Sequence, residues 1–296
     1  QVIMSFLLMS MVFVLWPRAD VSAQRVLEVI DTKPLITDGT HTEGEPGKQG
    51  EIEFRNVSFT YPDSRKAMLE GISFTAKKGQ TVAFIGSTGS GKSSLINLVP
   101  RFYDATQGQV LVDGVDVRDY TLKALRDKIG YVPQQSFLFK GTIASNVAYG
   151  DTERNDADVK TACDVAQATE FIDKKDKKYD SGIAQGGSNV SGGQKQRLSI
   201  ARAVYRHPEI LIFDDSFSAL DFKTDRAVRD ALEREAKNST KLIVAQRIGT
   251  IMNADRIIVL DDGKVVGQGT HHELLDNCEV YRQIAESQLS EDELNR

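Results

Sequence analysis

The sequence is poor in cysteine and carries no excess of positive charge. It has only two cysteines, Cys163 and Cys278, and 37 Lys and Arg against 42 Asp and Glu, for a net charge of -5. Two distant cysteines exclude a disulfide framework and lack the spacing of a metal site, so we expect free thiols in a reducing compartment. Proteins that bind nucleic acid usually present a basic face, and we therefore expect no nucleic acid among the partners.

One run of apolar residues stands out, at positions 1–16. It lacks the basic start and the small-residue cleavage site of a signal peptide. It also falls short of the about 20 residues that a full membrane span needs. A buried core helix is one alternative. The interpretation that we prefer is the end of a membrane-spanning helix that is cut on its N-terminal side.

Basic residues follow this run. Arg18 comes directly after Pro17, and Arg25 lies further on. Cations just beyond an apolar segment mark the cytoplasmic side of a membrane, so the rest of the chain is expected in the cytoplasm. Residues 1–30 would then be the end of the transmembrane helix with its cytoplasmic extension. Residues 31–50 contain many glycines and charges and are expected to form a linker.

Strand and helix patterns alternate from residue 51 to about residue 290, which predicts an α/β domain with a mainly parallel sheet. Helical spacing is found from Gly91 onward, in an insertion at 143–172, at 192–205 and from 270 to about 289. The last six residues, 291–296, would form a tail. Strands are expected at 52–59, 81–85, 110–112, 129–132, 210–213, 242–245 and 257–260.

A glycine-rich motif follows the strand predicted at 81–85. Glycines let successive backbone N–H groups point at one anion, Lys92 supplies a charge for nucleotide phosphates, and the Ser93 hydroxyl can ligate Mg²⁺. An ordinary turn is the alternative, which the strand–loop–helix context disfavours. The motif fits G-x-x-x-x-G-K-[ST] with Gly86, Ser87, Thr88, Gly89, Ser90, Gly91, Lys92 and Ser93, and Ser94 is the next candidate contact.

Two carboxylates, Asp214 and Asp215, follow the apolar residues 210–213. Ligands of open α/β sheets bind at the carboxyl ends of the strands, so Asp214 is expected to hold Mg²⁺. An apolar strand that ends in Asp is common in α/β proteins. Together with the phosphate-binding motif, however, it predicts a magnesium–nucleotide site.

A third motif, Ser191, Gly192, Gly193 and Gln194, lies between these two. At the start of a helix it would present a hydroxyl and free N–H groups to an anion, although a flexible turn with an N-cap serine has the same residues. The segment resembles the LSGGQ signature of ATP-binding cassette (ABC) proteins, with Val190 in place of leucine. This resemblance implies a head-to-tail pair of cassettes, in which the signature contacts the γ-phosphate of ATP held by the other cassette.

The resemblance covers residues 51 to about 289. Tyr61 is similar to the aromatic residue that stacks on adenine, Gln134 to the glutamine that ligates Mg²⁺ and senses the membrane domain, and Asp221 to the loop that joins the two sites. Segments 101–104 and 139–143 look like the exporter branch. The family fold is a P-loop NTPase core with an antiparallel β subdomain and an α-helical subdomain, here at about 135–205. Residues 1–30 would correspond to the end of the sixth membrane helix.

Two positions depart from the family pattern. Asp215 stands where the family has its hydrolytic glutamate, and Gln246 stands where it has a histidine; Gln185 also replaces a glutamate before the signature. Aspartate is shorter by one methylene, ~1.5 Å, and a displacement of about 1 Å can slow a reaction on the order of 100-fold. Glutamine can neither carry the charge of histidine nor share its proton.

These departures predict a subunit that binds ATP and Mg²⁺ but hydrolyses ATP slowly at its own site. Its signature would complete the active site of a second half-transporter, in a heterodimeric exporter of the plasma membrane. The cassette would lie on the cytoplasmic face, joined to a membrane domain. The alternatives are a slow homodimeric exporter, a soluble cassette ATPase and a regulatory subunit with little turnover. A P-loop kinase or GTPase would leave the signature motif unexplained.

Overall fold

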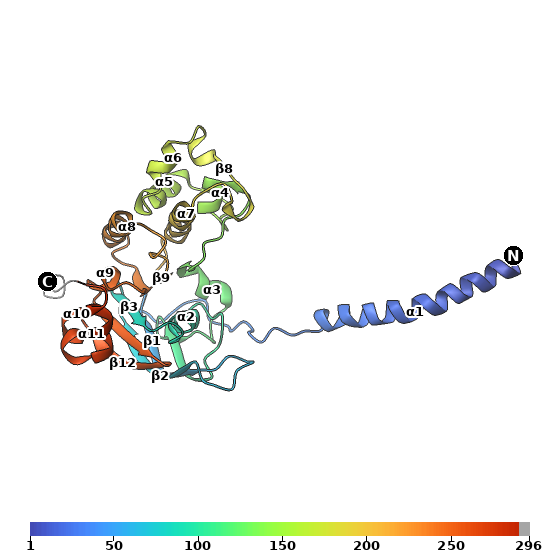
Figure 1. The fold of residues 1–296 in the computed structure, drawn as a ribbon, viewed down its shortest axis with the longest axis horizontal. Coiled ribbons are helices and arrows are strands. Elements are labelled where there is room, and N and C mark those ends of the chain that lie inside the picture. The colour runs from blue at the N-terminus through green and yellow to red at the C-terminus, as the bar shows by residue number, and fades with distance from the viewer. Residues whose placement is uncertain (290–296) are drawn as a thin grey trace. The chain divides into compact units, whose positions relative to one another are not determined.

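The computed structural model describes residues 1–289, so the tail predicted at 291–296 lies outside the described residues. The chain divides into two compact units, and the boundary falls after Thr37 (Figure 1). The second unit holds all the strands.

The first unit is built around one helix, α1, from Val2 to Ile30. The helix continues through Pro17, so the apolar run and the amphipathic segment after it form one element of 29 residues. At 1.5 Å per residue this helix is about 43 Å long. Its most apolar window has a mean hydropathy of 1.8, and none of that window is buried. By length and composition α1 can cross a membrane, although the run at 1–16 alone is short for a span.

The linker predicted at 31–50 divides at the same boundary. Residues from Asp38 onward belong to the second unit. The backbone N–H of Thr40 donates to Asp119 O at 2.8 Å, and that of Glu45 donates to Asp113 O at 2.8 Å. The composition of this stretch predicted a free linker, but its backbone is held by hydrogen bonds to the α/β unit.

A six-stranded sheet forms the centre of the second unit, with the order β12-β11-β3-β10-β9-β6. All neighbours are parallel except β12, which pairs antiparallel with β11 through the turn at 261–264. The strands are β3 (Thr81–Gly86), β6 (Ile129–Val132), β9 (Ile210–Asp214), β10 (Thr240–Val244), β11 (Arg256–Asp261) and β12 (Lys264–Gly269). Since β10 lies between β3 and β9, the ends of these three strands meet at one edge.

A second, four-stranded antiparallel sheet has the order β2-β1-β4-β5. Its strands are β1 (Ile52–Phe59), β2 (Leu69–Ala76), β4 (Gln107–Val112) and β5 (Val115–Asp116). The inward side chains of this sheet pack with those of the central sheet in one apolar cluster. This sheet is the antiparallel β subdomain that the resemblance implies, while β2 was not predicted.

Helices gather away from both sheets in the stretch that contains the predicted helical insertion (Figure 1). The helices are α4 (Ile143–Val147), α5 (Asp156–Val165), α6 (Thr169–Asp173) and α7 (Gly192–Tyr205), with the short strands β7 (Gly141–Thr142) and β8 (Gly182–Ile183) and the 3-10 turns η1 (Lys178–Asp180) and η2 (Gln185–Gly187). Helix α7 contacts α4, α5 and β6, so it joins this helical part to the central sheet.

The remaining helices flank the central sheet. They are α2 (Lys92–Asn97), α3 (Leu122–Asp127), α8 (Phe222–Glu235), α9 (Ile248–Ile251), α10 (His271–Asn277) and α11 (Glu279–Glu286). Helix α8 was not predicted. Together the two sheets and the helical part form the P-loop NTPase fold that the motifs indicate.

Candidate nucleotide-binding site

The glycine-rich loop connects β3 to α2 and has a backbone that only glycine allows at two points. Gly86 has φ +153°, and a Cβ there would lie 1.9 Å from Leu260 O. Gly91 has φ +96°, and its Cβ would lie 2.7 Å from Leu69 Cδ2. Both contacts are far inside van der Waals distance, so the loop can pass close to β11 and β2 only with glycine at these positions.

Lys92 folds back over this loop. Its Nζ donates to Gly86 O at 2.9 Å and to Ser87 O at 2.7 Å, and it lies 3.3 Å from Ser90 Oγ. Burial lowers the pKa of Lys92, while the charges of Asp215 and Asp214 act in the opposite direction. The ammonium group is thus held at the loop where an anion would lie.

The loop also offers backbone donors. In the part of the chain that the structure describes, the N–H groups of Thr88, Gly89 and Gly91 donate to no protein acceptor. Thr88 and Gly89 are exposed. Unpaired amides beside a lysine ammonium group form a concave anion site, which suits the phosphates of a nucleotide.

Oxygen ligands for a cation converge next to this loop. Ser93 Oγ donates to Asp214 Oδ1 at 2.7 Å, and the Tyr131 hydroxyl lies 3.3 Å from Asp214 Oδ2 and 3.0 Å from Asn97 Oδ1. Burial raises the pKa of Asp214, opposed by the hydrogen bonds from Ser93 and Tyr131 and by the charge of Lys92. Hydroxyl and carboxylate oxygens are ligands that Mg²⁺ prefers, and a buried carboxylate favours a nearby cation. The residues present therefore fit a magnesium ion.

Asp215 receives two amide donors on one oxygen. Gln246 Nε2 lies 2.7 Å from Asp215 Oδ2, and Gln134 Nε2 lies 3.2 Å from the same atom. Burial raises the pKa of Asp215; the hydrogen bonds from Gln134 and Gln246 lower it, and the charge of Asp214 raises it. The backbone of Asp215 is in the left-handed region, with φ 44°. The structure thus joins the three candidate catalytic side chains in one cluster.

Tyr61 lies at the edge of the loop. Its hydroxyl is 2.8 Å from Ser94 Oγ, and its ring makes edge contacts with Phe59 and Tyr103 at centroid distances of 4.7 and 5.1 Å. Tyr61 is half-buried. The hydrogen bond to Ser94 therefore holds an aromatic ring beside the glycine-rich loop, which is a suitable position for stacking on a base.

The signature residues begin α7. Ser191 Oγ accepts from Gln194 N at 3.3 Å, and Gln194 Oε1 accepts from Ser191 N at 3.1 Å, which makes a capping box. Ser191 and Gly192 are exposed, and a Cβ at Gly192 would meet no atom within 4 Å. Among the described residues, no hydrogen bond joins Ser191, Gly192, Gly193 or Gln194 to the phosphate-binding loop.

Asp221 caps the N-terminus of α8 and makes no hydrogen bond to the glycine-rich loop 86–93 among the described residues. Its Oδ1 accepts from Thr224 N at 3.0 Å and its Oδ2 from Thr224 Oγ1 at 2.7 Å. Ser218 Oγ donates to Asp215 O at 2.7 Å, so the segment from Asp215 to Asp221 is tied at both ends. Gln185 lies apart from this cluster, where its Oε1 accepts from Lys140 N at 3.3 Å.

Two contributors were not predicted. Tyr131 touches Asp214, as described above. Gln288, which follows α11, donates from Nε2 to Gln246 O at 2.8 Å, and its side-chain oxygen accepts from Ile248 N at 2.9 Å. Tyr131 precedes Gln134 on the end of β6, next to β9, and that strand pairing is the signal that would have identified it.

A family model described as "ABC transporter" matches residues 69–218. The chain is 44% identical over 292 residues to an uncharacterized ABC transporter ATP-binding protein of Mycobacterium tuberculosis, an alignment that covers 97% of this chain and 50% of that protein. It is 43% identical over 272 residues to the ATP-dependent lipid A-core flippase of Syntrophus aciditrophicus, covering 92% of this chain and 45% of the flippase.

A solved structure shares the fold. It is a bacterial Atm1-family ABC exporter with ATP bound, with a TM-score of 0.86 and 34% sequence identity, over 93% of this chain and 48% of that chain. The chain spans about half the length of the curated relatives that it matches.

Proposed function

Because this chain belongs to the ABC transporter family, we propose that it is the ATP-binding part of a membrane exporter, which uses ATP binding and hydrolysis to move a cargo. Its similarity to lipid A-core flippases and to an exporter with ATP bound favours an exporter over a soluble cassette ATPase. A helix that can cross a membrane, α1, supports the same choice. The cassette would lie on the cytoplasmic face of the plasma membrane.

The nucleotide would lie on the loop 86–93. Amides of the loop and the Lys92 ammonium group bind its phosphates, Tyr61 stacks on its base, and Ser94 positions that ring through the hydrogen bond at 2.8 Å. Ser93 and Asp214 would hold Mg²⁺, with Gln134 as a further ligand. The ion would supply positive charge to the β- and γ-phosphates.

We infer that this site hydrolyses ATP slowly, and one observation carries the inference: Asp215 Oδ2 accepts hydrogen bonds from both Gln134 and Gln246. A general base must reach the proton of the attacking water before its pKa matters. The shorter aspartate lies ~1.5 Å back from the position of a glutamate oxygen. Of its two oxygens, one is already engaged by the two amides.

The intact signature suggests the second half of the proposal. Ser191 and Gly192 are exposed at the start of α7, where a hydroxyl and free N–H groups favour an anion. In a head-to-tail pair they would contact ATP on the partner cassette. A partner with glutamate and histidine at the two departing positions would then hydrolyse most of the ATP in a heterodimer.

A slow homodimeric exporter is the competing function, because Asp215 is still a carboxylate. ATP turnover distinguishes the homodimer from the heterodimer. It is measured on the purified membrane protein that contains this chain, first alone and then together with the candidate partner. The heterodimer predicts little activity alone and a large increase with the partner. Brisk turnover by this chain alone at neutral pH would refute it.

Lys92→Ala in this chain gives a matched test within the assembled pair. Saturable binding of MgATP to this chain's site should be lost, because the loop loses its only ammonium group. Turnover at the partner's site should largely remain. The matched control is Lys78→Ala at an exposed lysine outside the loop, which should change neither quantity. If the Lys92 variant still bound MgATP normally, the assignment of the nucleotide site would be wrong.

A further inference from the structure

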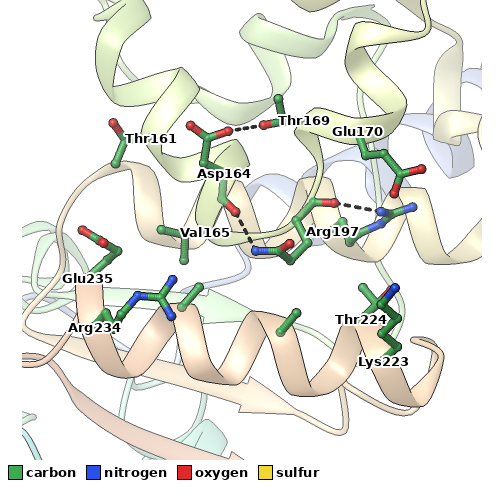
Figure 2. A pocket seen from close by; sticks show the side chains of 13 residues that line it. Thr161, Asp164, Val165, Thr169, Glu170, Arg197, Lys223, Thr224, Arg234 and Glu235 are labelled. Atoms are coloured by element: carbon green, nitrogen blue, oxygen red, sulfur yellow. Dashed lines mark hydrogen bonds between the residues drawn. The ribbon is translucent and has the colours of Figure 1, made fainter.

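A cavity lies between the helical part and α8, away from the nucleotide site. Its volume is 590 Å³, within the range of sites that enclose small organic ligands. It is lined by residues of α5, α6, α7 and α8 and by none of the loop 86–93, Asp214 or Asp215. Figure 2 shows these side chains around the opening between α8 and the helices that face it.

One face of α8 makes the floor of this cavity. Lys223, Ala227, Ala231 and Glu235 all line it. They are spaced four residues apart, so they form one row along the helix. Two alanines in the middle of the row leave room, and the buried Val165 of α5 adds apolar surface. The cavity therefore has an apolar middle and a charged group at each end of the row.

The end near Lys223 is cationic. The Arg197 guanidinium donates from Nη1 to Gln167 O at 2.8 Å and lies 4.8 Å from the centre of the Phe171 ring. Its Nε is buried and, among the described residues, has no hydrogen-bond partner. The charges of Glu170 and Asp221 act on this guanidinium, but neither makes an ion pair with it among the described residues, so an anion at its accessible side would be stabilised. Lys223 is exposed and forms no hydrogen bond or ion pair within residues 1–289.

Two of the three acidic side chains that line the cavity have partners, and the third, Glu235, lies at the far end of the row next to Arg234 in the sequence. Glu170 Oε1 is bound to Lys174 Nζ at 2.6 Å, and Asp164 Oδ1 accepts from the Thr169 hydroxyl. Figure 2 places the Glu170 carboxylate on the same side as the Arg197 guanidinium, and no ion pair joins them. With Glu170 paired to Lys174 and Asp221 acting on Arg197, the remaining positive charge at this end is that of Lys223.

We propose that this cavity binds a small organic anion, with a carboxylate, sulfonate or phosphate group between Arg197 and Lys223 and a short apolar body over Ala227 and Ala231. Such a ligand would bridge α7, which carries the signature, and α8, which follows Asp221. In an exporter it would change turnover at the partner's site; that consequence rests on the proposed function, whereas binding needs only this fold.

Fluorescence titration of the full chain with 8-anilinonaphthalene-1-sulfonate tests the proposal, with the uncharged N-phenyl-1-naphthylamine as matched ligand. Saturable binding of the sulfonate is expected. Lys223→Glu should weaken it at least ~10-fold through charge reversal beside the anion and leave the uncharged probe unaffected. Arg226→Glu makes the same charge change on α8 outside the cavity lining and should have no effect.

Further variants locate the probe. Ala227→Phe fills the floor and should weaken binding of the sulfonate, whereas Lys92→Ala should not change it. Benzoate should displace the probe better than inorganic phosphate, since only benzoate has an apolar body. The proposal is overturned if Lys223→Glu and Ala227→Phe both bind the sulfonate like the parent chain, or if Lys92→Ala abolishes binding. It also fails if phosphate competes as well as benzoate.

Discussion

The double substitution Asp215→Glu with Gln246→His is expected to raise ATP hydrolysis at this chain's own site. Asp215 Oδ2 now lies 2.7 Å from Gln246 Nε2 and 3.2 Å from Gln134 Nε2. One more methylene moves the carboxylate outward by ~1.5 Å. Because a misplacement of about 1 Å can slow a reaction on the order of 100-fold, a gain of similar size is expected. Histidine at position 246 also restores a group that can carry charge.

Backbone strain works against this gain. Asp215 has φ 44°, a region that aspartate tolerates better than glutamate, so the longer residue should destabilise the fold by about 1 kcal/mol. Asp262 has φ 39° and is exposed in the β11–β12 turn, where its carboxylate pairs with Lys66 and makes no contact with Asp215. Asp262→Glu is therefore a matched control. It should lower the unfolding midpoint by a similar amount and leave hydrolysis unchanged.

The assay is single-turnover hydrolysis of ATP bound to this chain. It uses the assembled pair, with the phosphate-loop lysine of the partner cassette replaced so that only this chain's site can hydrolyse ATP. Asp215→Glu alone should raise hydrolysis less than the double substitution does, because the amide of Gln246 still binds the carboxylate. If the double variant binds ATP and folds normally but hydrolyses it no faster, the explanation of the slow site is refuted.

Two further predictions concern other residues. Tyr131→Phe removes a hydrogen bond of about 1 kcal/mol from Asp214, so Mg²⁺ affinity in magnesium titrations should fall several-fold while binding of magnesium-free ATP stays the same; an equal loss of both would contradict the role given to Tyr131. Burial lowers the pKa of His271, whose Nδ1 is 2.7 Å from the Tyr281 hydroxyl. The ordinary pKa of histidine is 6.5, so just below that pH the unfolded chain binds a proton at His271 and the folded chain does not. The free energy of unfolding should therefore fall as the pH drops below 6.5. Thermal unfolding at about pH 7.5 and about pH 5.5 should show this loss, strongly reduced in His271→Gln but largely retained in His272→Gln, because the charge of His272 is the smaller cause of the lowered pKa.

The sequence alone predicted the elements that have a simple residue pattern, such as a continuous apolar run or a fixed motif spacing. Strand β9 is apolar at every position before Asp214, and the loop 86–93 is fixed by the spacing of its glycines and Lys92. Strand β2 was missed because its pairing with β1 has register shifts and its burial does not alternate regularly. Helix α8 was missed because few apolar residues, such as Val228 and Leu232, lie among many charges.

The linker prediction failed in part for a different reason. Composition describes a segment in isolation, and the residues after Asp38 are polar and rich in glycine. Their order comes from backbone hydrogen bonds to Asp113 and Asp119, which lie far along the chain. No local pattern records such long-range backbone partners.

Residue types at the site could be predicted, but not all of their contacts. Asp215 and Gln246 were recognised as departures from a family pattern, at the ends of β9 and β10. The meeting of Gln134 and Gln246 on one oxygen depends on β9 lying between β6 and β10. Strand order follows from the whole topology, so spacing along the chain does not contain it.

The contacts of Asp215 also bear on how the two sites of a cassette pair could influence each other. Ser136, two residues after Gln134, donates to Gln196 Oε1 at 2.5 Å on α7, the helix that begins at the signature. Ser218 Oγ donates to Asp215 O at 2.7 Å, in the segment that leads to Asp221. One donor of Asp215, Gln134, and the Ser218 side chain that binds its carbonyl therefore lie next to elements that would face the partner. A longer carboxylate that displaced Gln134 would disturb α7 as well, so turnover at the partner's site should change together with hydrolysis at this one.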